Sequence, residues 1–337
     1  MRLVTFEAQS PWGPMRRLGL WRSPDILDVN AAYRALLART EDVGFAERYA
    51  AVVLPADMLG YLKAGQRGRA ALAEVDAHWT AGSTPAHLAG WPVTFAETDV
   101  RLLAPLPRPN TLRDFSTFEQ HQARVTRAKG NAEVPAVWYE IPVYWKANPE
   151  NVVGPEAEIC WPAYAEQLDY ELEFGVVIGR AGRDIPKSQA AGYIAGYTIF
   201  NDISARDRQA KETVMTFGPA KGKDFDTSKI LGPCLVTPDE FGTGSQRMTA
   251  RINGEQWSEG RTGDMHWSFA DLIAYVSESE TLKPGDFLGS GACGTGCGLE
   301  LGRWLQPGDV MELSVEGIGT LRNRVVRCQA SAVGSQA

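Results

Sequence analysis

Short apolar segments separated by glycine-rich turns dominate the chain after about residue 110. LDYELEFGVVIG (168–179) alternates polar and apolar residues and then becomes a continuous apolar run, which predicts a buried strand. YIAGYTIFND (193–202) predicts a second buried strand, whereas MTARINGEQ and VMELSVEGIGTLRNRVV predict hairpins with glycine turns. The segment 267–279 has the apolar spacing of an amphipathic helix. Because helices and strands do not alternate regularly, we predict a β-rich α+β fold.

The first part of the chain has a different pattern and predicts a smaller N-terminal domain. Helical spacing of apolar residues occurs over 28–40 and over part of 55–74. Three closely spaced prolines follow in LLAPLPRPN, and such a run favours extended, stiff backbone. We therefore expect a small domain over 1–105 and a larger catalytic domain over 106–337.

Composition excludes several classes of protein. The chain has 34 basic and 41 acidic side chains and a formal charge of −7, which argues against nucleic-acid binding. No apolar run reaches the ~18–20 residues of a membrane span, and no signal-peptide pattern is visible, so we expect a cytoplasmic protein without a membrane partner. Four histidines and five unevenly spaced cysteines argue against a metal site rich in these residues. We expect free buried thiols, without a disulfide, at Cys160, Cys234, Cys293, Cys297 and Cys328.

Two glutamates interrupt the first predicted strand. Glu171 and Glu173 are two residues apart, so their side chains point to the same face of a strand. Two acids on a buried face repel each other and lose hydration, and a divalent cation would offset both costs. The alternative is an exposed strand face with two ordinary glutamates.

Polar side chains also follow the second predicted strand, in FNDISARDRQ. Asp202 ends the strand, and Arg206 and Gln209 share a face if the next segment is helical. A carboxylate suits a hard cation, while the guanidinium and the amide suit a substrate carboxylate or carbonyl. The alternative is a helix-capping aspartate beside a surface arginine.

RDFSTFEQHQARV places an acid and a histidine seven residues apart. Asp114 and His121 would share a face if the segment is helical. Histidine is the side chain best suited to proton transfer near neutral pH. The alternative for a lone histidine is a surface position or a satisfied core position.

Two glycine-rich segments carry further charged candidates. Lys223 lies in GPAKGKDFDTS, where Asp224 follows it, so the segment is not a phosphate-binding loop. Glu300 lies near the end of GSGACGTGCGLELG (289–302), and glycines there would allow close approach of the backbone to a ligand. The alternative is a set of tight turns between strands.

Together these segments resemble the fumarylacetoacetate hydrolase superfamily. The elements DF…H, ELE, NDxSARDxQ, GKxF and GSG…GLEL stand in the family's order over about residues 110–305. The resemblance implies a fumarylacetoacetase C-terminal-like mixed β-sandwich roll, with a divalent cation held by carboxylates at its mouth. Residues 1–105 resemble the smaller N-terminal domain of the longer family members only loosely.

The resemblance also implies roles for individual residues. The implied metal ligands are Asp114, Glu171, Glu173 and Asp202. His121 would be the catalytic base, oriented by Glu300. The implied contacts to the substrate and to the developing oxyanion are Arg206, Gln209 and Lys223, with Tyr144 as a further substrate contact.

Two positions complicate this assignment. Ala292 stands where the family usually has a threonine in GSGT, so a hydroxyl that could touch the substrate carboxylate is missing. Glu119 lies two residues before His121 and could compete with Glu300 as its partner.

The activity implied by the resemblance is hydrolysis of a C–C bond. The expected substrate is an acylpyruvate or β-diketo acid, similar to fumarylacetoacetate, in the catabolism of aromatic compounds. His121 would take a proton from water, and the basic side chains would stabilise the oxyanion. Mg²⁺ is the expected cofactor, with Ca²⁺ and Mn²⁺ as alternatives because the same oxygen ligands serve all three.

Other activities on the same fold remain open. One alternative is an isomerase, hydratase or decarboxylase of a 2-keto acid, and another is a non-catalytic ligand-binding member. As family members are commonly dimers, the resemblance also implies a homodimer.

Overall fold

One large sheet combines N-terminal strands with strands from the rest of the chain. The computed structural model describes residues 1–128, 130, 132–216 and 218–328. The strands of the large sheet are β1 (Arg2–Ser10), β2 (Gly13–Arg22), β3 (Asp25–Asp28), β6 (Thr94–Ala96), β7 (Arg101–Leu103), β8 (Leu112–Phe115), β9 (Tyr144–Ala147), β10 (Val152–Val153), β13 (Leu172–Ile178), β14 (Ile194–Asp202), β16 (Lys229–Val236) and β19 (Phe287–Gly289). Their order within the described residues is β6-β3-β2-β1-β16-β14-β13-β19-β8-β9, with β7 beside β1 and β10 beside β16.

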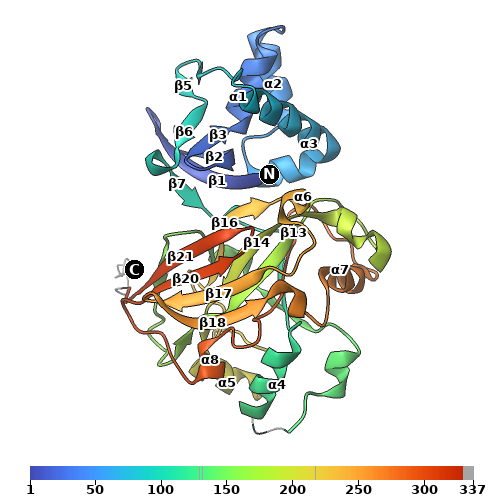
Figure 1. Cartoon of the computed structure of the whole chain (residues 1–337), viewed down its shortest axis with the longest axis vertical. Coiled ribbons are helices and arrows are strands. Elements are labelled where there is room, and N and C mark those ends of the chain that lie inside the picture. The colour runs from blue at the N-terminus through green and yellow to red at the C-terminus, as the bar shows by residue number, and fades with distance from the viewer. Residues whose placement is uncertain (129, 131, 217, 329–337) are drawn as a thin grey trace, which may run out of the picture.

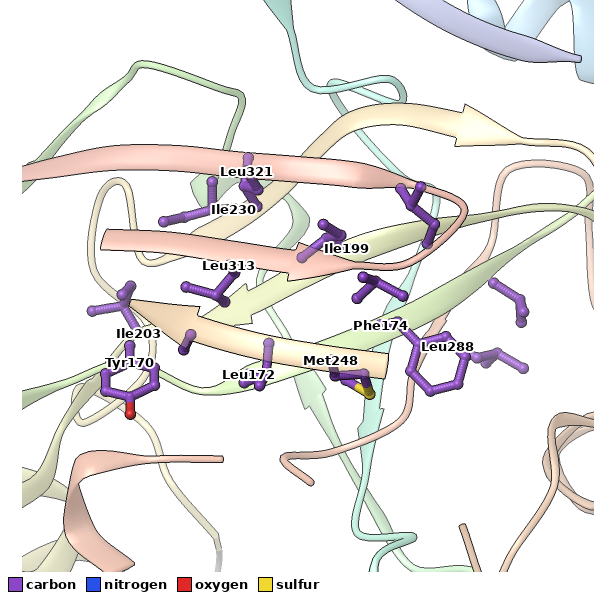
Figure 2. Close-up of a cluster of buried hydrophobic side chains, with 14 of the residues drawn as sticks. Tyr170, Leu172, Phe174, Ile199, Ile203, Ile230, Met248, Leu288, Leu313 and Leu321 are labelled. Carbon is purple, nitrogen blue, oxygen red and sulfur yellow. The ribbon is translucent and has the colours of Figure 1, made fainter. Parts of the chain in front are cut away.

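A smaller sheet lies over the central strands and forms the second layer of a sandwich. It has the order β11-β21-β20-β17-β18, formed by β11 (Glu158–Cys160), β17 (Arg247–Ile252), β18 (Glu255–Arg261), β20 (Val310–Val315) and β21 (Gly319–Val326). Figure 2 shows Leu313 and Met248 of this sheet lying over Phe174 and Ile199 of the large sheet. The buried apolar cluster between the layers confirms the predicted β-rich sandwich. Two short pairs complete the strands of the described chain, β4 (His87–Leu88) with β5 (Trp91–Pro92), and β12 (Leu168–Asp169) with β15 (Ser204–Ala205).

The N-terminal strands and helices lie together at one end of the molecule and are called the N-terminal layer below (Figure 1). Helices α1 (Val29–Leu37), α2 (Val43–Val53) and α3 (Met58–Thr80) pack beside β1, β2 and β3. The large sheet continues from β1 into β16, where Leu3 lies opposite Leu235. The domain boundary near residue 105 stays a prediction, and the end of the predicted second domain, 329–337, lies outside the described residues.

The remaining α-helices of the described chain are short and lie around the sandwich. They are α4 (Glu119–Ala128), α5 (Arg206–Thr213), α6 (Pro238–Phe241), α7 (Phe269–Ser277) and α8 (Gly298–Leu301). The helix predicted over 267–279 is α7, where Ser268 and Asp271 form a capping box. The helix predicted over 28–40 is α1, capped by the Asp28 carboxylate. Among the described helices, none combines the length and the apolar character that crossing a membrane requires.

The expectation of five free thiols is wrong for two of the cysteines. Cys160 and Cys328 form a disulfide between positions 168 residues apart in sequence. The pairing of β11 with β21 places Cys160 opposite Val326, so Cys328 comes within reach two residues later. Cys234, Cys293 and Cys297 are buried free thiols, as expected.

Candidate active site

Four acidic side chains meet at neighbouring central strands of the large sheet. Asp114 lies on β8, Glu173 lies on β13, Asp202 ends β14, and Glu171 directly precedes β13. One carboxylate oxygen of each lies within 4.8 Å of the others, and all four side chains are buried. The structure therefore brings together the four residues that the sequence proposed as metal ligands.

Basic side chains compensate this group of acids only in part. Lys223 Nζ lies 2.5 Å from both Glu171 Oε2 and Asp202 Oδ2. Lys229 Nζ lies 2.5 Å from Asp202 Oδ1. Among the described residues, one connected group of charged side chains surrounds the four acids. Its acids are Asp114, Asp169, Glu171, Glu173 and Asp202, and its cations are Arg206, Lys223 and Lys229. Fully ionised, this group carries two uncompensated negative charges, which equals the charge of one divalent cation.

Two buried carboxylate oxygens of the group, Asp114 Oδ1 and Glu173 Oε1, have neither a hydrogen-bond partner nor an ion-pair partner within the described chain. Asp202 Oδ1 also lacks a hydrogen bond but has the ion pair with Lys229. The companion oxygens of Asp114 and Glu173 are bonded, since Trp145 Nε1 donates to Asp114 Oδ2 at 3.1 Å and the Gly291 N–H donates to Glu173 Oε2 at 3.0 Å. Leaving such a group unpaired costs about 1–3 kcal/mol, and more when it is charged. An all-oxygen set with free lone pairs fits a hard cation such as Mg²⁺, Ca²⁺ or Mn²⁺.

The pKa values of the acids express the same imbalance. Burial raises the pKa of Asp114 to about 7, and the Asp202 carboxylate adds to the rise. Burial likewise raises the pKa of Glu173 well above its usual value, with further contributions from Asp114 and Glu171. Burial opposes ionisation of Glu171 as well, but the Arg206 and Lys223 cations overcome it and hold the pKa of Glu171 well below its usual range. Without a cation, the structure therefore favours a proton on Asp114 or Glu173.

The predicted substrate-binding residues surround the same group of acids. Arg206 is buried, and its Nη2 and Nε atoms lie 2.7 Å from Glu171 Oε1 and from Asp169 Oδ2. Arg206 Nη1 donates to Gln209 Oε1 at 3.0 Å, so the two side chains share a face of α5 as expected. Lys223 Nζ donates one N–H to Glu171 Oε2 and another to Asp202 Oδ2, which leaves the third ammonium N–H for a ligand.

His121 and Glu300 form a hydrogen-bonded pair beside the acids. His121 Nδ1 lies 2.7 Å from Glu300 Oε1, and the Thr295 N–H donates to Glu300 Oε2 at 2.9 Å. Helices α4 and α8, which carry the pair, lie close together at the end of the sandwich opposite to the N-terminal layer (Figure 1). Glu119 does not compete for the histidine, because it accepts a hydrogen bond from Tyr139 instead.

Asp114 and His121 do not lie on one helix, so the condition under which they would share a helical face is not met. Asp114 belongs to strand β8, and α4 begins at Glu119. The two side chains nevertheless line the same cavity, because the chain turns between the strand and the helix. Their proximity is therefore a tertiary contact and not a consequence of helical spacing.

A cavity of about 510 Å³ is lined by His121 and by three of the four acids, Asp114, Glu171 and Glu173. This volume is in the range of small-molecule sites, about 300–1,000 Å³. Tyr144 and Ala292 line the cavity, as do Leu299 and Val125, which supply apolar surface. The contact of Tyr144 with a substrate stays a prediction, and Ala292 presents a methyl group to the cavity where the resemblance led us to expect a hydroxyl.

Glycines make room for the acidic side chains. Gly289 lies opposite Asp114 in the pairing of β19 with β8. A Cβ atom at Gly289 would lie 2.8 Å from Asp114 Oδ1 and 3.0 Å from Phe200. Gly291 has a φ of 78° and donates its N–H to Glu173. The glycine-rich segment thus admits one carboxylate and binds another.

Sequence reasoning missed three residues of this site. Asp169 accepts from Arg206 and from two backbone N–H groups of α8, Lys229 contacts Asp202, and Trp145 donates to Asp114. A signal existed for two of them. Asp169 shares the alternation of LDYELE, and Lys229 is a charged residue at the start of the apolar segment ILGPCLV.

The arrangement of these elements corresponds to a known family. The model of the fumarylacetoacetate hydrolase C-terminal domain matches residues 110–326, which include every site residue described above. The chain belongs to this family.

The proteins of the fumarylacetoacetate hydrolase family that are similar to this chain are named after different activities. The human mitochondrial oxaloacetate tautomerase is 32% identical over 231 residues, which cover 68% of this chain and 70% of that protein. The crystal structure of 5-carboxymethyl-2-hydroxymuconate delta-isomerase from Mycobacterium smegmatis is 26% identical, covers 97% of this chain and 100% of that one, and has a TM-score of 0.65. The fumarylacetoacetate hydrolase from Exiguobacterium antarcticum is 26% identical with the same coverage and a TM-score of 0.67. The family assignment therefore supports an enzyme, while the type of reaction needs a separate argument.

Proposed function

We propose that this protein is a divalent-metal-dependent isomerase that interconverts the keto and enol forms of a 2-keto acid such as oxaloacetate. The observation that carries the proposal is the His121–Glu300 pair, whose histidine lines the same cavity as three of the four acids. A keto–enol interconversion needs one group that accepts and returns a proton at carbon, beside a site that stabilises charge on the adjacent oxygen. The relatives named as a tautomerase and an isomerase support this reaction over the C–C hydrolysis that the sequence first indicated.

The chain supplies the proton-transfer group through His121. Because Nδ1 is engaged with Glu300, the Nε2 atom is the one left to accept a proton from C3 of the substrate. The fully buried Glu300 carboxylate stabilises the imidazolium that results. Return of the proton to C3 completes the reverse reaction.

The other side chains bind and orient the acid. A divalent cation held by Asp114, Glu171, Glu173 and Asp202 would polarise the substrate carbonyl and so acidify the neighbouring C–H bond. The free N–H of Lys223 can stabilise negative charge on the C2 oxygen until solvent protonates it. Gln209 accepts from Arg206 through its oxygen, which leaves its amide nitrogen to donate to a substrate carboxylate.

The experiment is a tautomerase assay that starts from the enol form of oxaloacetate. Loss of enol ultraviolet absorbance is followed with Mg²⁺ present, against the reaction without protein. His121→Ala should lower kcat by about 10²–10⁴-fold, the usual contribution of a general base. His78→Ala is the matched control, because this histidine lies on α3 in the N-terminal layer and should leave the rate unchanged. A wild-type rate equal to the background, or an unaffected His121→Ala variant, would refute the proposal.

Hydrolysis of an acylpyruvate is the second candidate. The same histidine–glutamate pair could activate water, and the Exiguobacterium hydrolase shares the fold at 26% identity. Mass spectrometry of the products separates the two reactions, because hydrolysis adds water and yields two smaller acids. Cleavage of an acylpyruvate without acceleration of keto–enol interconversion would favour this second candidate.

A further inference from the structure

A second group of potential metal ligands lies beside the four acids and has a different chemistry. His121, Cys297 and Glu300 each offer a donor atom, and the three atoms lie within 4.8 Å of one another. The group combines an imidazole, a thiol and a carboxylate, whereas the neighbouring acids offer oxygen alone. Zn²⁺ and other thiophilic cations bind through cysteine and histidine, and Mg²⁺ does not.

The Glu300 carboxylate is held in a position from which one oxygen faces the other two donor atoms. Its Oε2 atom accepts the Thr295 N–H at 2.9 Å, which fixes the carboxylate. Its Oε1 atom faces both His121 Nδ1, at 2.7 Å, and Cys297 Sγ, at 3.5 Å. Ideal tetrahedral zinc with normal bond lengths separates a sulfur from an oxygen ligand by about 3.6 Å and a nitrogen from an oxygen ligand by about 3.4 Å. The sulfur–oxygen spacing already matches, and the nitrogen–oxygen spacing of 2.7 Å would have to lengthen by about 0.7 Å.

An ion can reach this group from the cavity and meets two ligands that can carry negative charge, although Arg124 Nε already lies 3.7 Å from Glu300 Oε2. The side chain of His121 lines the cavity, while Cys297 and Glu300 are buried behind it. A thiolate and a carboxylate together neutralise a divalent cation, and binding would release the thiol proton. Three protein ligands leave a fourth position for water, as in open zinc sites.

We propose that His121, Cys297 and Glu300 form a binding site for a thiophilic divalent cation such as Zn²⁺, distinct from the four-carboxylate group. A cation on Nδ1 replaces the hydrogen bond between His121 and Glu300, so the imidazole loses its support as a proton acceptor. Zn²⁺ would then lower kcat with little change in KM, because the groups that bind the substrate remain in place. This inhibitory consequence rests on the proposed function, whereas binding of the cation does not.

Binding is tested directly with Cd²⁺ as the probe. Protein saturated with Mg²⁺ is titrated with Cd²⁺, and the ultraviolet charge-transfer band of a cadmium–thiolate bond is recorded. The wild type should develop the band with one equivalent, and Cys297→Ser should lose it. Cys293→Ser is the matched control, since this buried thiol lies only four residues earlier and is not among the three ligands. A band that persists in Cys297→Ser, or is absent from the wild type, would overturn the proposal.

A second measurement separates loss of the ligand from loss of the fold. Cys297→Ser should retain the increase in melting temperature that Mg²⁺ produces, because the four acids are unchanged. Glu300→Gln should also weaken Cd²⁺ binding, by at least about tenfold. Unaltered Cd²⁺ affinity in Glu300→Gln would exclude the carboxylate as a ligand and contradict the proposed site.

The inhibitory step has its own readout. At saturating Mg²⁺, Zn²⁺ should inhibit the wild type and Cys293→Ser, while Cys297→Ser should need at least about tenfold more Zn²⁺ for the same fractional inhibition. If Cd²⁺ binds at Cys297 but Zn²⁺ leaves kcat unchanged, the link to His121 is wrong. If the protein turns over no keto acid, the proposed function fails, and the Cd²⁺ titration still decides the site.

Discussion

The imbalance of charge among the four acids predicts that removing one of them stabilises the metal-free protein. The test variant is Asp114→Asn, which keeps the shape of the side chain and can still accept the Trp145 N–H. The folded-state pKa of Asp114 is raised from 3.8 to about 7. Its contribution to stability is therefore fully present below about pH 4 and is lost as the pH rises to about 7. At pH 8 the wild-type carboxylate is ionised and carries the full cost.

The magnitude follows from the size of the pKa difference. Three pH units correspond to about 4 kcal/mol at 1.36 kcal/mol per unit. Burial of the new amide offsets about 1–3 kcal/mol of this gain, so Asp114→Asn should stabilise the metal-free protein at pH 8 by about 2 kcal/mol. Unfolding entropy for a chain of this length converts 1 kcal/mol to about 1.4 °C, which gives a rise of about 3 °C in melting temperature.

The assay is thermal unfolding with chelator and with Mg²⁺. A concentration of Mg²⁺ 100 times its Kd adds about 2.7 kcal/mol, or about 4 °C, to the wild type, and Asp114→Asn should lose most of this increase. Asp286→Asn is the matched control, because this buried acid binds Thr111 away from the four acids and should keep the Mg²⁺ effect. The reasoning fails if metal-free Asp114→Asn melts below the wild type at pH 8, or if it keeps the full Mg²⁺ effect.

Three further predictions follow from the same contacts. Lys229→Met removes a buried cation from Asp202 and should lower the free energy of unfolding of the metal-free protein by about 3–5 kcal/mol. Denaturant unfolding measures this loss, and an unchanged midpoint of the unfolding curve would contradict the pairing. Gly289→Ala places a methyl group 2.8 Å from Asp114 Oδ1, so calorimetry should show weaker Mg²⁺ binding, whereas Gly192→Ala, in open space, should bind normally. Because the pKa of Asp114 is about 7 without metal, a proton competes with the cation below that pH. Mg²⁺ affinity should therefore rise between about pH 6 and 8, and binding should release a proton. An Mg²⁺ affinity that does not change with pH over this range would argue against Asp114 as a ligand.

Local patterns were sufficient to predict much of the fold. The alternation in 168–179 predicted a buried strand, and two-residue periodicity predicted that Glu171 and Glu173 face the same side. The amphipathic spacing over 267–279 predicted α7. These features depend on neighbouring residues in the chain, so the sequence alone contains them.

Contacts between distant segments could not be predicted in this way. Asp114 and His121 share a cavity because of the turn between β8 and α4, although helical spacing suggested another reason. Lys229 reaches Asp202 through the pairing of β14 with β16, and Cys160 reaches Cys328 through the pairing of β11 with β21. Such contacts depend on strand order, which local hydrophobic periodicity does not determine. The family resemblance named the four acids, the His121–Glu300 pair, Arg206 and Lys223, but not Lys229, which also contacts Asp202.

The claim that the four acids and the histidine pair form one catalytic site is tested most directly by hydrogen exchange at C3 of oxaloacetate. Deuterium incorporation from D₂O is followed by NMR, with and without Mg²⁺, above the rate without protein. The wild type should accelerate exchange only with a divalent cation, and both His121→Ala and Glu173→Gln should abolish the acceleration. Enzyme-dependent exchange that persists in chelator, or in either variant, would contradict a single metal-dependent site.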